Sequence, residues 1–250
     1  MSRRQRKQNC NKYRKQKSKG DNYLRIIEGG ALLRTRQKEV NIIPRNFNQD
    51  NLLGHLEDNN INIVFAVGPA GTGKTLISTL AGIKQLKNSK IDKFVVTRPA
   101  VSVDEQHGFL PGTLMEKMAP WTRPIFDVFE EYYTPEQLEY MINDNKVEVA
   151  PLAYMRGRTF KNAFIIADEM QNATDSQMKM LLTRIGTGSK IVVTGDLNQH
   201  DRGYESNGLK MFMDRLVAKG STSIKFIEFE NTDIERHPAV AEVLRLYGEA

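Results

Sequence analysis

A glycine-rich run between two apolar segments constrains this chain more than any other feature. Residues 63–67 read IVFAV, and residues 76–86 read LISTLAGIKQL, which is typical of a helix. Between them the sequence matches G-x-x-x-x-G-K-[ST], with a strand before it and a helix after it, as this motif requires. We therefore predict a phosphate-binding loop (P-loop) made of Gly68, Pro69, Ala70, Gly71, Thr72, Gly73, Lys74 and Thr75.

The residue types of this loop suit ATP and Mg²⁺. Glycine has no Cβ, so the backbone can approach phosphate oxygens closely, and the N–H groups and the helix N-terminus favour negative charge. Lys74 can reach the β- and γ-phosphates, and the Thr75 hydroxyl can hold Mg²⁺. The alternative is a glycine-rich turn that only connects strand to helix. The match at every motif position and at both flanks argues against it.

A second chemical centre follows another apolar strand. Residues 162–167 read NAFIIA and end in the adjacent carboxylates Asp168 and Glu169. We expect Asp168 to hold Mg²⁺ directly or through water, and Glu169 to orient and deprotonate the attacking water. Such a pair is common by chance, but after a buried strand in a chain with a P-loop it indicates nucleotide hydrolysis.

Further candidates lie at or near other predicted strand ends. The strand at 190–194 leads into Gln199, which could lie beside the γ-phosphate and sense its loss. Gln49 precedes the P-loop strand, and its amide could pair with adenine, although taken alone a surface glutamine is the simpler interpretation. Arg236 could act as an arginine finger or could pair with a carboxylate of the same chain. Three arginines are candidates for binding phosphate through their guanidinium groups. Arg98 lies at a strand exit, and Arg156 and Arg158 lie on a predicted loop.

The charge of the chain is concentrated at its N-terminus. Of the 36 basic residues, nine lie in residues 1–20, which hold no acidic residue, so the other 27 face 30 acidic residues and give a net charge of −3. We expect residues 1–22 to be a disordered basic tail. It would be either a solubilising tail or an arm that binds nucleic-acid phosphates, and the sequence favours neither.

Composition excludes several classes. Cys10 is the only cysteine, so no intrachain disulfide can form, which fits a reducing compartment, and we expect a cytoplasmic protein. No apolar run approaches the roughly 18 residues that a membrane span needs, and the N-terminus lacks the apolar part of a secretory signal. The four histidines are scattered, so a zinc site is not expected.

The pattern of elements predicts an α/β fold. We divide the chain into the tail at 1–22, a lead-in at 23–50 with a small hairpin, and a domain at 51–250. We expect a helix over 50–57 and one over 113–142 that Pro120, Pro124 and Pro135 break or restart. The aromatic residues of that segment are Trp121, Phe126, Phe129, Tyr132 and Tyr133. They would either pack in the core, which their spacing favours, or stack on bases.

Taken together, these blocks resemble the PhoH-like ATPases, the phosphate-starvation-inducible group. The resemblance rests on GPAGTGKT, VTRPAV, GFLPG, PLAYMRGRTFKNAFIIADEMQNAT, QMKMLLTRIGTGSKIVVTGD and DIERHPAV, and runs from about Ile42 to Tyr247. That family is similar to the first motor domain of superfamily 1 helicases. The resemblance implies a RecA-like three-layer α/β/α core with a mainly parallel sheet, in which one strand separates those that carry Thr75 and Asp168.

The resemblance also implies roles for single residues. Glu169 would be the catalytic carboxylate, Gln49 would contact adenine, and Gln199 would sense the γ-phosphate. The residues near nucleic acid or phosphate would be Arg98, Arg156 and Arg158. Members are expected to hydrolyse ATP, to associate as homo-oligomeric rings and to be linked to RNA.

Three departures from the family pattern stand out. No second motor domain is expected, the basic tail replaces the extra N-terminal domain of longer relatives, and Asn198 and residues 201–204 differ from the usual pattern. The compact form is similar to versions carried by bacteriophages. Our first hypothesis is an Mg²⁺-dependent ATPase coupled to RNA or single-stranded DNA and completed by Arg184 or Arg236 of a neighbouring subunit. The alternatives are an ATP-binding switch or scaffold with negligible turnover, and a small-molecule kinase.

Overall fold

The chain forms two compact units, residues 1–39 and 40–250. The computed structural model describes residues 24–26, 32–34, 38–99, 114–199 and 207–235, together with Ala239 and Leu246. In the first unit, β1 (Leu24–Ile26) pairs antiparallel with β2 (Leu32–Arg34), which confirms the predicted hairpin. The basic tail lies outside the described residues.

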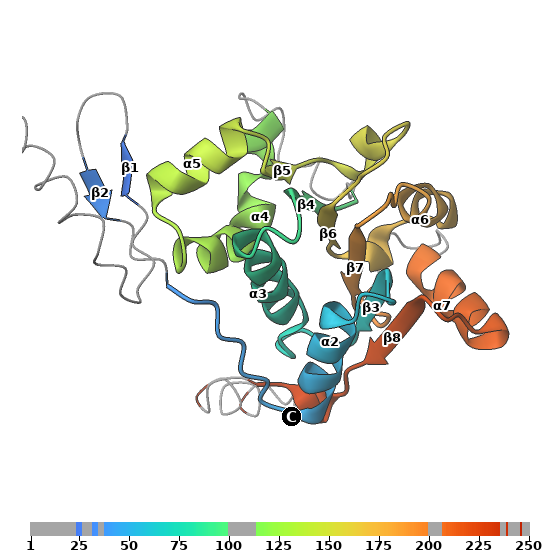
Figure 1. The fold of residues 1–250 in the computed structure, drawn as a ribbon. Coiled ribbons are helices and arrows are strands. Elements are labelled where there is room, and N and C mark those ends of the chain that lie inside the picture. Colours follow the sequence, from blue (N-terminus) through green and yellow to red (C-terminus); the bar gives the residue numbers. More distant parts are fainter. Residues whose placement is uncertain are drawn as a thin grey trace, which may run out of the picture. The chain divides into compact units, whose positions relative to one another are not determined.

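The second unit is built on one six-stranded sheet in which every neighbouring pair is parallel. Its order is β5-β4-β6-β7-β3-β8 (Figure 1). β7 therefore separates β3, which leads into the P-loop, from β6, which leads to Asp168, as the resemblance predicted. The strands are β3 (Ile63–Val67), β4 (Lys93–Thr97), β5 (Val147–Val149), β6 (Ala163–Ala167), β7 (Lys190–Gly195) and β8 (Ile224–Glu228).

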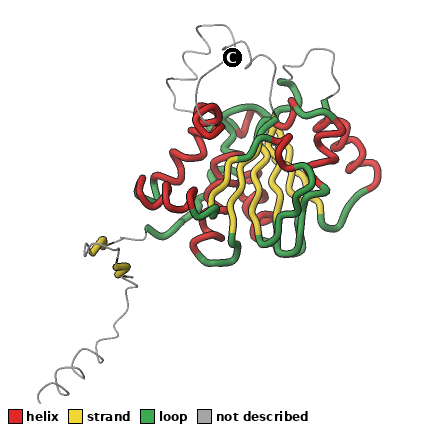
Figure 2. Tube along the Cα trace, turned by 90° about the horizontal axis from the view of Figure 1, so that it is seen from above, coloured by secondary structure: helices red, strands yellow, loops and turns green. Residues whose placement is uncertain are grey.

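Helices cover both faces of this sheet, so the predicted three-layer α/β/α arrangement is confirmed (Figure 2). Successive side chains of a strand point to opposite faces, and each face has its own core. One face carries α2 (Phe47–Glu57), α3 (Lys74–Lys87), α4 (Leu114–Glu130) and α5 (Pro135–Asn143). The other face carries η2 (Leu152–Met155), η3 (Met170–Asn172), α6 (Asp175–Leu182) and α7 (Gly208–Lys219).

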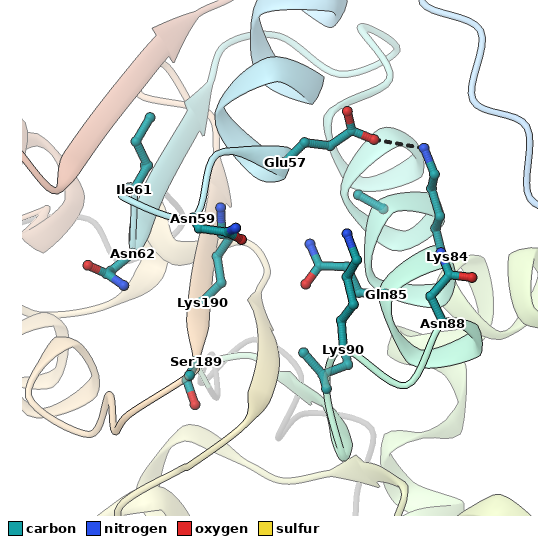
Figure 3. Close-up of a pocket in the computed structure, with 13 residues that line it drawn as sticks. Glu57, Asn59, Ile61, Asn62, Lys84, Gln85, Asn88, Lys90, Ser189 and Lys190 are labelled. Carbon is teal, nitrogen blue, oxygen red and sulfur yellow. Dashed lines mark hydrogen bonds and ion pairs between the residues drawn. The ribbon is translucent and has the colours of Figure 1, made fainter.

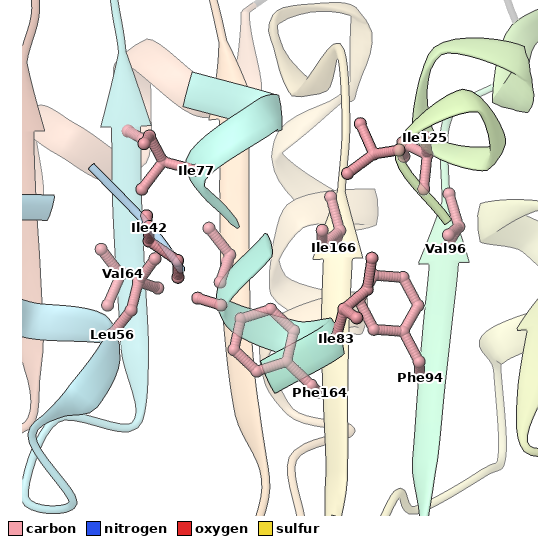
Figure 4. Packing of buried hydrophobic residues seen from close by; sticks show 14 of the residues in the cluster. Ile42, Leu56, Val64, Ile77, Ile83, Phe94, Val96, Ile125, Phe164 and Ile166 are labelled. Atoms are coloured by element: carbon pink, nitrogen blue, oxygen red, sulfur yellow. The ribbon is translucent and has the colours of Figure 1, made fainter. Parts of the chain in front are cut away.

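Phenylalanine rings join the helices of the first face to the sheet (Figure 4). The rings of Phe94 and Phe164 stack with centroids 5.9 Å apart, and Phe129 of α4 meets Phe94 edge-on at 4.9 Å. Phe129 is fully buried, and Phe126, Tyr132 and Tyr133 pack partly buried against the same core. For these four residues the structure therefore supports core packing over base stacking.

Two boundaries differ from those expected. The compact unit begins at Val40, not at residue 51, because Val40 and Ile42 are already buried in the core. α2 begins at Phe47, since the Asn46 side chain caps the helix by accepting from the Gln49 N–H. In the described part of the chain, no helix is long and apolar enough to cross a bilayer.

The expected helix break was wrong at two of three prolines. Pro120 and Pro124 lie within α4, whereas Pro135 is the first residue of α5, where a missing N–H costs nothing. A proline inside a helix removes one backbone hydrogen bond, and α4 retains its helical path because Ile125 and Phe129 anchor it to the core.

Candidate functional site

The P-loop connects β3 to α3 and needs glycine at two crowded positions. Gly68 has a φ of +137°, and a Cβ there would lie 2.3 Å from the Phe229 carbonyl oxygen. Gly73 has a φ of +82°, and its Cβ would lie 2.8 Å from Gln49 Nε2. Both residues have positive φ values, which residues with a side chain rarely adopt. The conformation of the loop therefore requires glycine at these positions, even before a phosphate binds.

Lys74 turns back into its own loop. Its Nζ donates to the Gly68 carbonyl at 2.7 Å, to the Pro69 carbonyl at 2.6 Å and to Thr72 Oγ1 at 3.1 Å. Burial lowers the pKa of Lys74, an effect that the carboxylates of Asp196, Glu169 and Asp168 oppose. The ammonium group thus lies at the loop, next to carboxylates, where an entering phosphate would exchange for the loop carbonyls.

Thr75 and Asp168 meet across 93 residues of sequence. Thr75 Oγ1 donates to Asp168 Oδ1 at 3.2 Å, and Thr194 Oγ1 from β7 donates to the same oxygen. The Asp168 N–H donates to the Thr97 carbonyl of β4 at 2.9 Å, which fixes the backbone where β6 ends. A hydroxyl and a carboxylate oxygen at this spacing are the hard oxygen ligands that Mg²⁺ prefers, so the residues present fit the ion.

Glu169 is held in an unusual conformation. Its φ of +54° lies in the left-handed region, which is uncommon for a residue with a side chain. The Glu169 carboxylate accepts a hydrogen bond from Gln171 Nε2 at 2.5 Å. The carbonyl oxygen of the same Gln171 amide accepts from the Asp196 N–H at 3.1 Å. The two carboxylates after β6 therefore have different partners: Asp168 accepts from threonine hydroxyls, and Glu169 accepts from the Gln171 amide.

These groups surround one cavity at the carboxyl edge of the sheet, where open α/β sheets bind ligands. It has a volume of about 290 Å³. Three strand ends contribute to it: β3 through the P-loop, β6 through the carboxylate pair, and β7 through the turn that ends at Gln199. Its lining includes Gly68, Gly71, Gly73, Lys74, Thr75, Asp168, Glu169, Asp196 and Gln199.

The sequence that forms this site matches a known family, described as PhoH-like protein, over residues 41–248. The chain belongs to the PhoH-like protein family. It is 40% identical to the PhoH-like protein of Synechocystis sp., over 88% of this chain and 66% of the relative. It is 46% identical to that of Bacillus subtilis, over 75% of this chain and 59% of the relative. The predicted resemblance is confirmed.

Protein PhoH of Escherichia coli is 38% identical over 89% of this PhoH-like chain and 62% of its own length. The chain thus spans roughly three fifths to two thirds of these relatives. Among solved structures, the large terminase of a thermophilic bacteriophage aligns over 82% of this chain and 51% of its own, with 12% identity and a TM-score of 0.49. That likeness is too distant to bear on function. Family and P-loop together make this chain a P-loop NTPase.

In this PhoH-like chain, Gln49 holds the P-loop through a side-chain hydrogen bond. Its Nε2 donates to the Thr72 carbonyl at 3.0 Å, and its Oε1 accepts from the Arg45 N–H at 2.8 Å. The side chain is buried and is not part of the cavity lining. Both polar atoms of the amide are therefore engaged within the chain, and the expected adenine contact would require one of these bonds to be exchanged.

The arginines expected near phosphate or nucleic acid differ in their surroundings. Arg158 donates through two nitrogens to the Glu148 carboxylate, which keeps the pKa of Glu148 below its usual value despite burial, and its guanidinium lies over the Phe160 ring at 4.5 Å. Arg156 is exposed. Arg98 follows β4, and its Nε is buried without a hydrogen-bond partner among the described residues.

Of the two finger candidates, Arg184 is described, and it is not part of the cavity lining. Arg184 follows α6, where its three nitrogens donate to the Met180 carbonyl, the Arg158 carbonyl and Thr183 Oγ1. This arrangement caps the end of its own helix. Arg236 and the divergent segment at 201–204 lie outside the described residues.

A larger cavity of about 610 Å³ lies at the opposite, amino edge of the sheet (Figure 3). Two of its cations have partners: Lys84 pairs with Glu57 at 2.7 Å, and Lys190 Nζ donates to the His55 and Asp58 carbonyls at 2.9 and 2.8 Å. Lys190 thereby neutralises carbonyls at the C-terminal end of α2. Because it lacks the P-loop and the carboxylate pair, this cavity is not the candidate site, despite its size.

Sequence reasoning missed three residues of the site. Thr194, Gln171 and Asp196 all contact the carboxylate pair or the turn beside it. Thr194 and Asp196 flank the end of β7, so their place at a strand end was a usable signal. Gln171 lies two residues after Glu169, and sequence spacing alone does not indicate that its amide turns back.

Proposed function

We propose that this protein is an Mg²⁺-dependent ATPase whose turnover is coupled to RNA or single-stranded DNA. The contact between Thr75 and Asp168 carries the proposal, because it joins the P-loop helix to the carboxylate pair beside one cavity. A phosphate-binding loop alone would serve a simple binder. A carboxylate next to the metal-ligand pair adds the base that hydrolysis needs.

Five residues of the cavity have a role in this proposal. Thr75 and Asp168 would hold Mg²⁺, which would supply positive charge beside the phosphates. Lys74 moves from the loop carbonyls to the phosphates, while the N–H groups of the loop bind the phosphate oxygens. Glu169 orients the attacking water and accepts its proton. Gln199, exposed at the cavity, contacts the γ-phosphate.

The nucleic-acid part of the proposal rests on exposed cationic and aromatic groups. Arg156 is exposed, and Tyr154 two residues before it is 65% exposed, which suits stacking on a base beside a phosphate contact. Arg98 adds a buried Nε without a described partner at the end of β4. Arg158 is a weaker candidate, since Glu148 already neutralises it.

A neighbouring subunit would complete the site in a homo-oligomeric ring. No arginine is among the described residues that line the cavity, although transition-state charge in P-loop NTPases is commonly balanced by one. Arg184 would have to leave its helix-capping bonds to serve. Arg236, outside the described residues, is the other finger candidate.

The test is ATP hydrolysis with Mg²⁺ at two protein concentrations, with and without single-stranded RNA, beside the Glu169→Gln variant. We expect specific activity to rise with protein concentration and with RNA. Glu169→Gln should bind ATP normally but lose about 10²–10⁴-fold in turnover, the usual contribution of a general base. Unchanged turnover in Glu169→Gln would contradict the role of Glu169 as the general base.

The same assay separates the two alternatives. ATP binding with negligible turnover under every condition would identify a switch or scaffold. Phosphate transfer to an added nucleoside or nucleotide would identify a small-molecule kinase. Activity without any response to RNA, single-stranded DNA or protein concentration would leave a simple ATPase and overturn the coupling.

A further inference from the structure

Gln171 is a buried glutamine that contacts two parts of the site at once. Its side chain is 1% exposed. Its Nε2 donates to Glu169 Oε2 at 2.5 Å, and its Oε1 accepts from the Asp196 N–H at 3.1 Å. Since one end of an amide only donates and the other only accepts, rotating this group by half a turn would break both bonds. The amide therefore has one orientation that suits both neighbours.

On one side, Gln171 restrains the carboxylate of Glu169, whose direction the backbone alone would not fix. Glu169 has a left-handed φ of +54° and immediately precedes η3, which carries Gln171. A conformation of this kind persists only where surrounding contacts hold it. The Glu169 carbonyl accepts from the Asn172 N–H at 3.1 Å, which holds the backbone, and the 2.5 Å bond from Gln171 fixes the direction of the carboxylate.

On the other side, Gln171 holds the turn that ends in Gln199. The Asp196 N–H is bonded to Gln171, the Asp196 carboxylate accepts from the Asn198 N–H at 2.9 Å, and the Asp196 carbonyl accepts from the Gln199 N–H at 3.3 Å. Gly195 packs closely against the Gln171 amide, because a Cβ on Gly195 would lie 2.8 Å from Gln171 Oε1. Movement of the turn therefore displaces an atom bonded directly to the Gln171 amide.

We propose that Gln171 is a positioning residue that links Gln199 to Glu169, so that the Glu169 carboxylate is aligned for water only when Gln199 engages the γ-phosphate. This inference rests on the ATPase proposed above. Gln171 does not line the cavity, so it acts through Glu169 and not on the nucleotide. Its loss should lower kcat and leave nucleotide affinity nearly unchanged.

Two substitutions separate this role from simple packing. Gln171→Met keeps the length of the side chain and removes both hydrogen bonds. Gln171→Glu keeps an acceptor for the Asp196 N–H but replaces the donor to Glu169 with a second carboxylate, so it removes the bond to Glu169 and sets two acceptors against each other. We expect kcat to fall about tenfold in Gln171→Met and further in Gln171→Glu.

The experiment measures kcat, the dissociation constant of a fluorescent ATP analogue, and thermal stability, for wild type and both variants. Gln85→Met is the matched control, because Gln85 donates to the Leu56 carbonyl at the opposite edge of the sheet. It should keep the wild-type kcat and affinity. Affinity in the Gln171 variants should stay within about threefold of wild type.

A double-mutant cycle tests the link itself. If Gln171 transmits the state of Gln199, then Gln199→Ala should lower kcat much less in the Gln171→Met background than in wild type. Additive effects of the two substitutions, or folded Gln171 variants with wild-type kcat, would overturn the inference. Failure of the ATPase proposal looks different, since wild type itself would then show no turnover.

Discussion

Lys190 is a buried cation, 8% exposed, whose Nζ donates to two carbonyl oxygens at the end of α2. Burial lowers its pKa from 10.5 to about 8, partly opposed by Asp58. Below pH 8 the folded and unfolded chains both hold the proton. Between pH 8 and 10.5 the unfolded chain keeps it and the folded chain releases it, so this residue makes stability rise with pH. A neutral amine still has two N–H groups for the two carbonyls.

We therefore predict that Lys190→Met removes a stability increase between pH 8 and 10.5, on the order of 1–3 kcal/mol. The measurement is chemical denaturation at several pH values. Lys84→Met is the control, because Lys84 pairs with Glu57 in an exposed position, and it should retain the increase. An equal pH slope in wild type and Lys190→Met would contradict the prediction.

The sequence predicted residues better where a motif fixes their surroundings. Thr75, Asp168 and Gln199 lie at one cavity as expected, because strand ends of a parallel sheet share an edge. Arg158, Arg184 and Gln49 bond within the chain, which the sequence did not predict, and their expected ligand contacts stay predictions. Which carboxylate or carbonyl comes near a polar side chain depends on tertiary packing, and no local pattern records it.

Two helix glycines of this protein should respond oppositely to alanine. A Cβ on Gly82 of α3 would lie 2.3 Å from the Phe94 ring and 2.8 Å from the Phe164 ring, whereas a Cβ on Gly54 of α2 meets nothing within 4 Å. We predict that Gly82→Ala lowers the free energy of unfolding by about 1–3 kcal/mol through overpacking. Gly54→Ala should raise it by about 0.5–1 kcal/mol, since alanine suits a helix better than glycine.

Urea denaturation of both variants measures this difference. Because each substitution adds the same methyl group to a helix interior, either variant is the control for the other. Stabilisation by both, or destabilisation by both, would contradict the packing of α3 against the sheet.

At the level of elements, the buried strands were easy to predict and α4 was not. Strands such as β3 and β6 are short, fully apolar runs bounded by turn residues, which the sequence displays directly. In α4, Pro120 and Pro124 predicted a break in the helix. The helix nevertheless continues through both prolines, because Ile125 and Phe129 are buried in the core. Local propensity gave the wrong answer where distant residues supplied the stabilising contacts.

For the whole molecule, the order of the sheet decides which strand ends can cooperate. β7 between β3 and β6 brings Thr194 within reach of Asp168 and places the Gln199 turn beside the P-loop. Spacing along the chain does not contain this order. It was available only through the resemblance to a known family.

The charge distribution also acts at this scale. Residues 1–20 hold nine cations, and the compact unit that carries the site begins at Val40. We predict that replacing these nine residues by glutamine leaves ATP turnover without RNA unchanged but makes RNA binding less dependent on salt. Each lost phosphate contact would change the slope of log K against log salt by about 0.7 for a single strand. An unchanged slope would mean that the tail only solubilises.

Lys74 bonds to the carbonyls of its own loop, and for the proposed ATPase this has a consequence for product release. An ammonium group without another partner in a half-buried loop would hold the departing nucleotide tightly. The Gly68 and Pro69 oxygens would instead accept its hydrogen bonds as the phosphates leave, so release would not leave an unpaired charge. The free protein would then be ready to bind the next nucleotide without a counter-ion from solution.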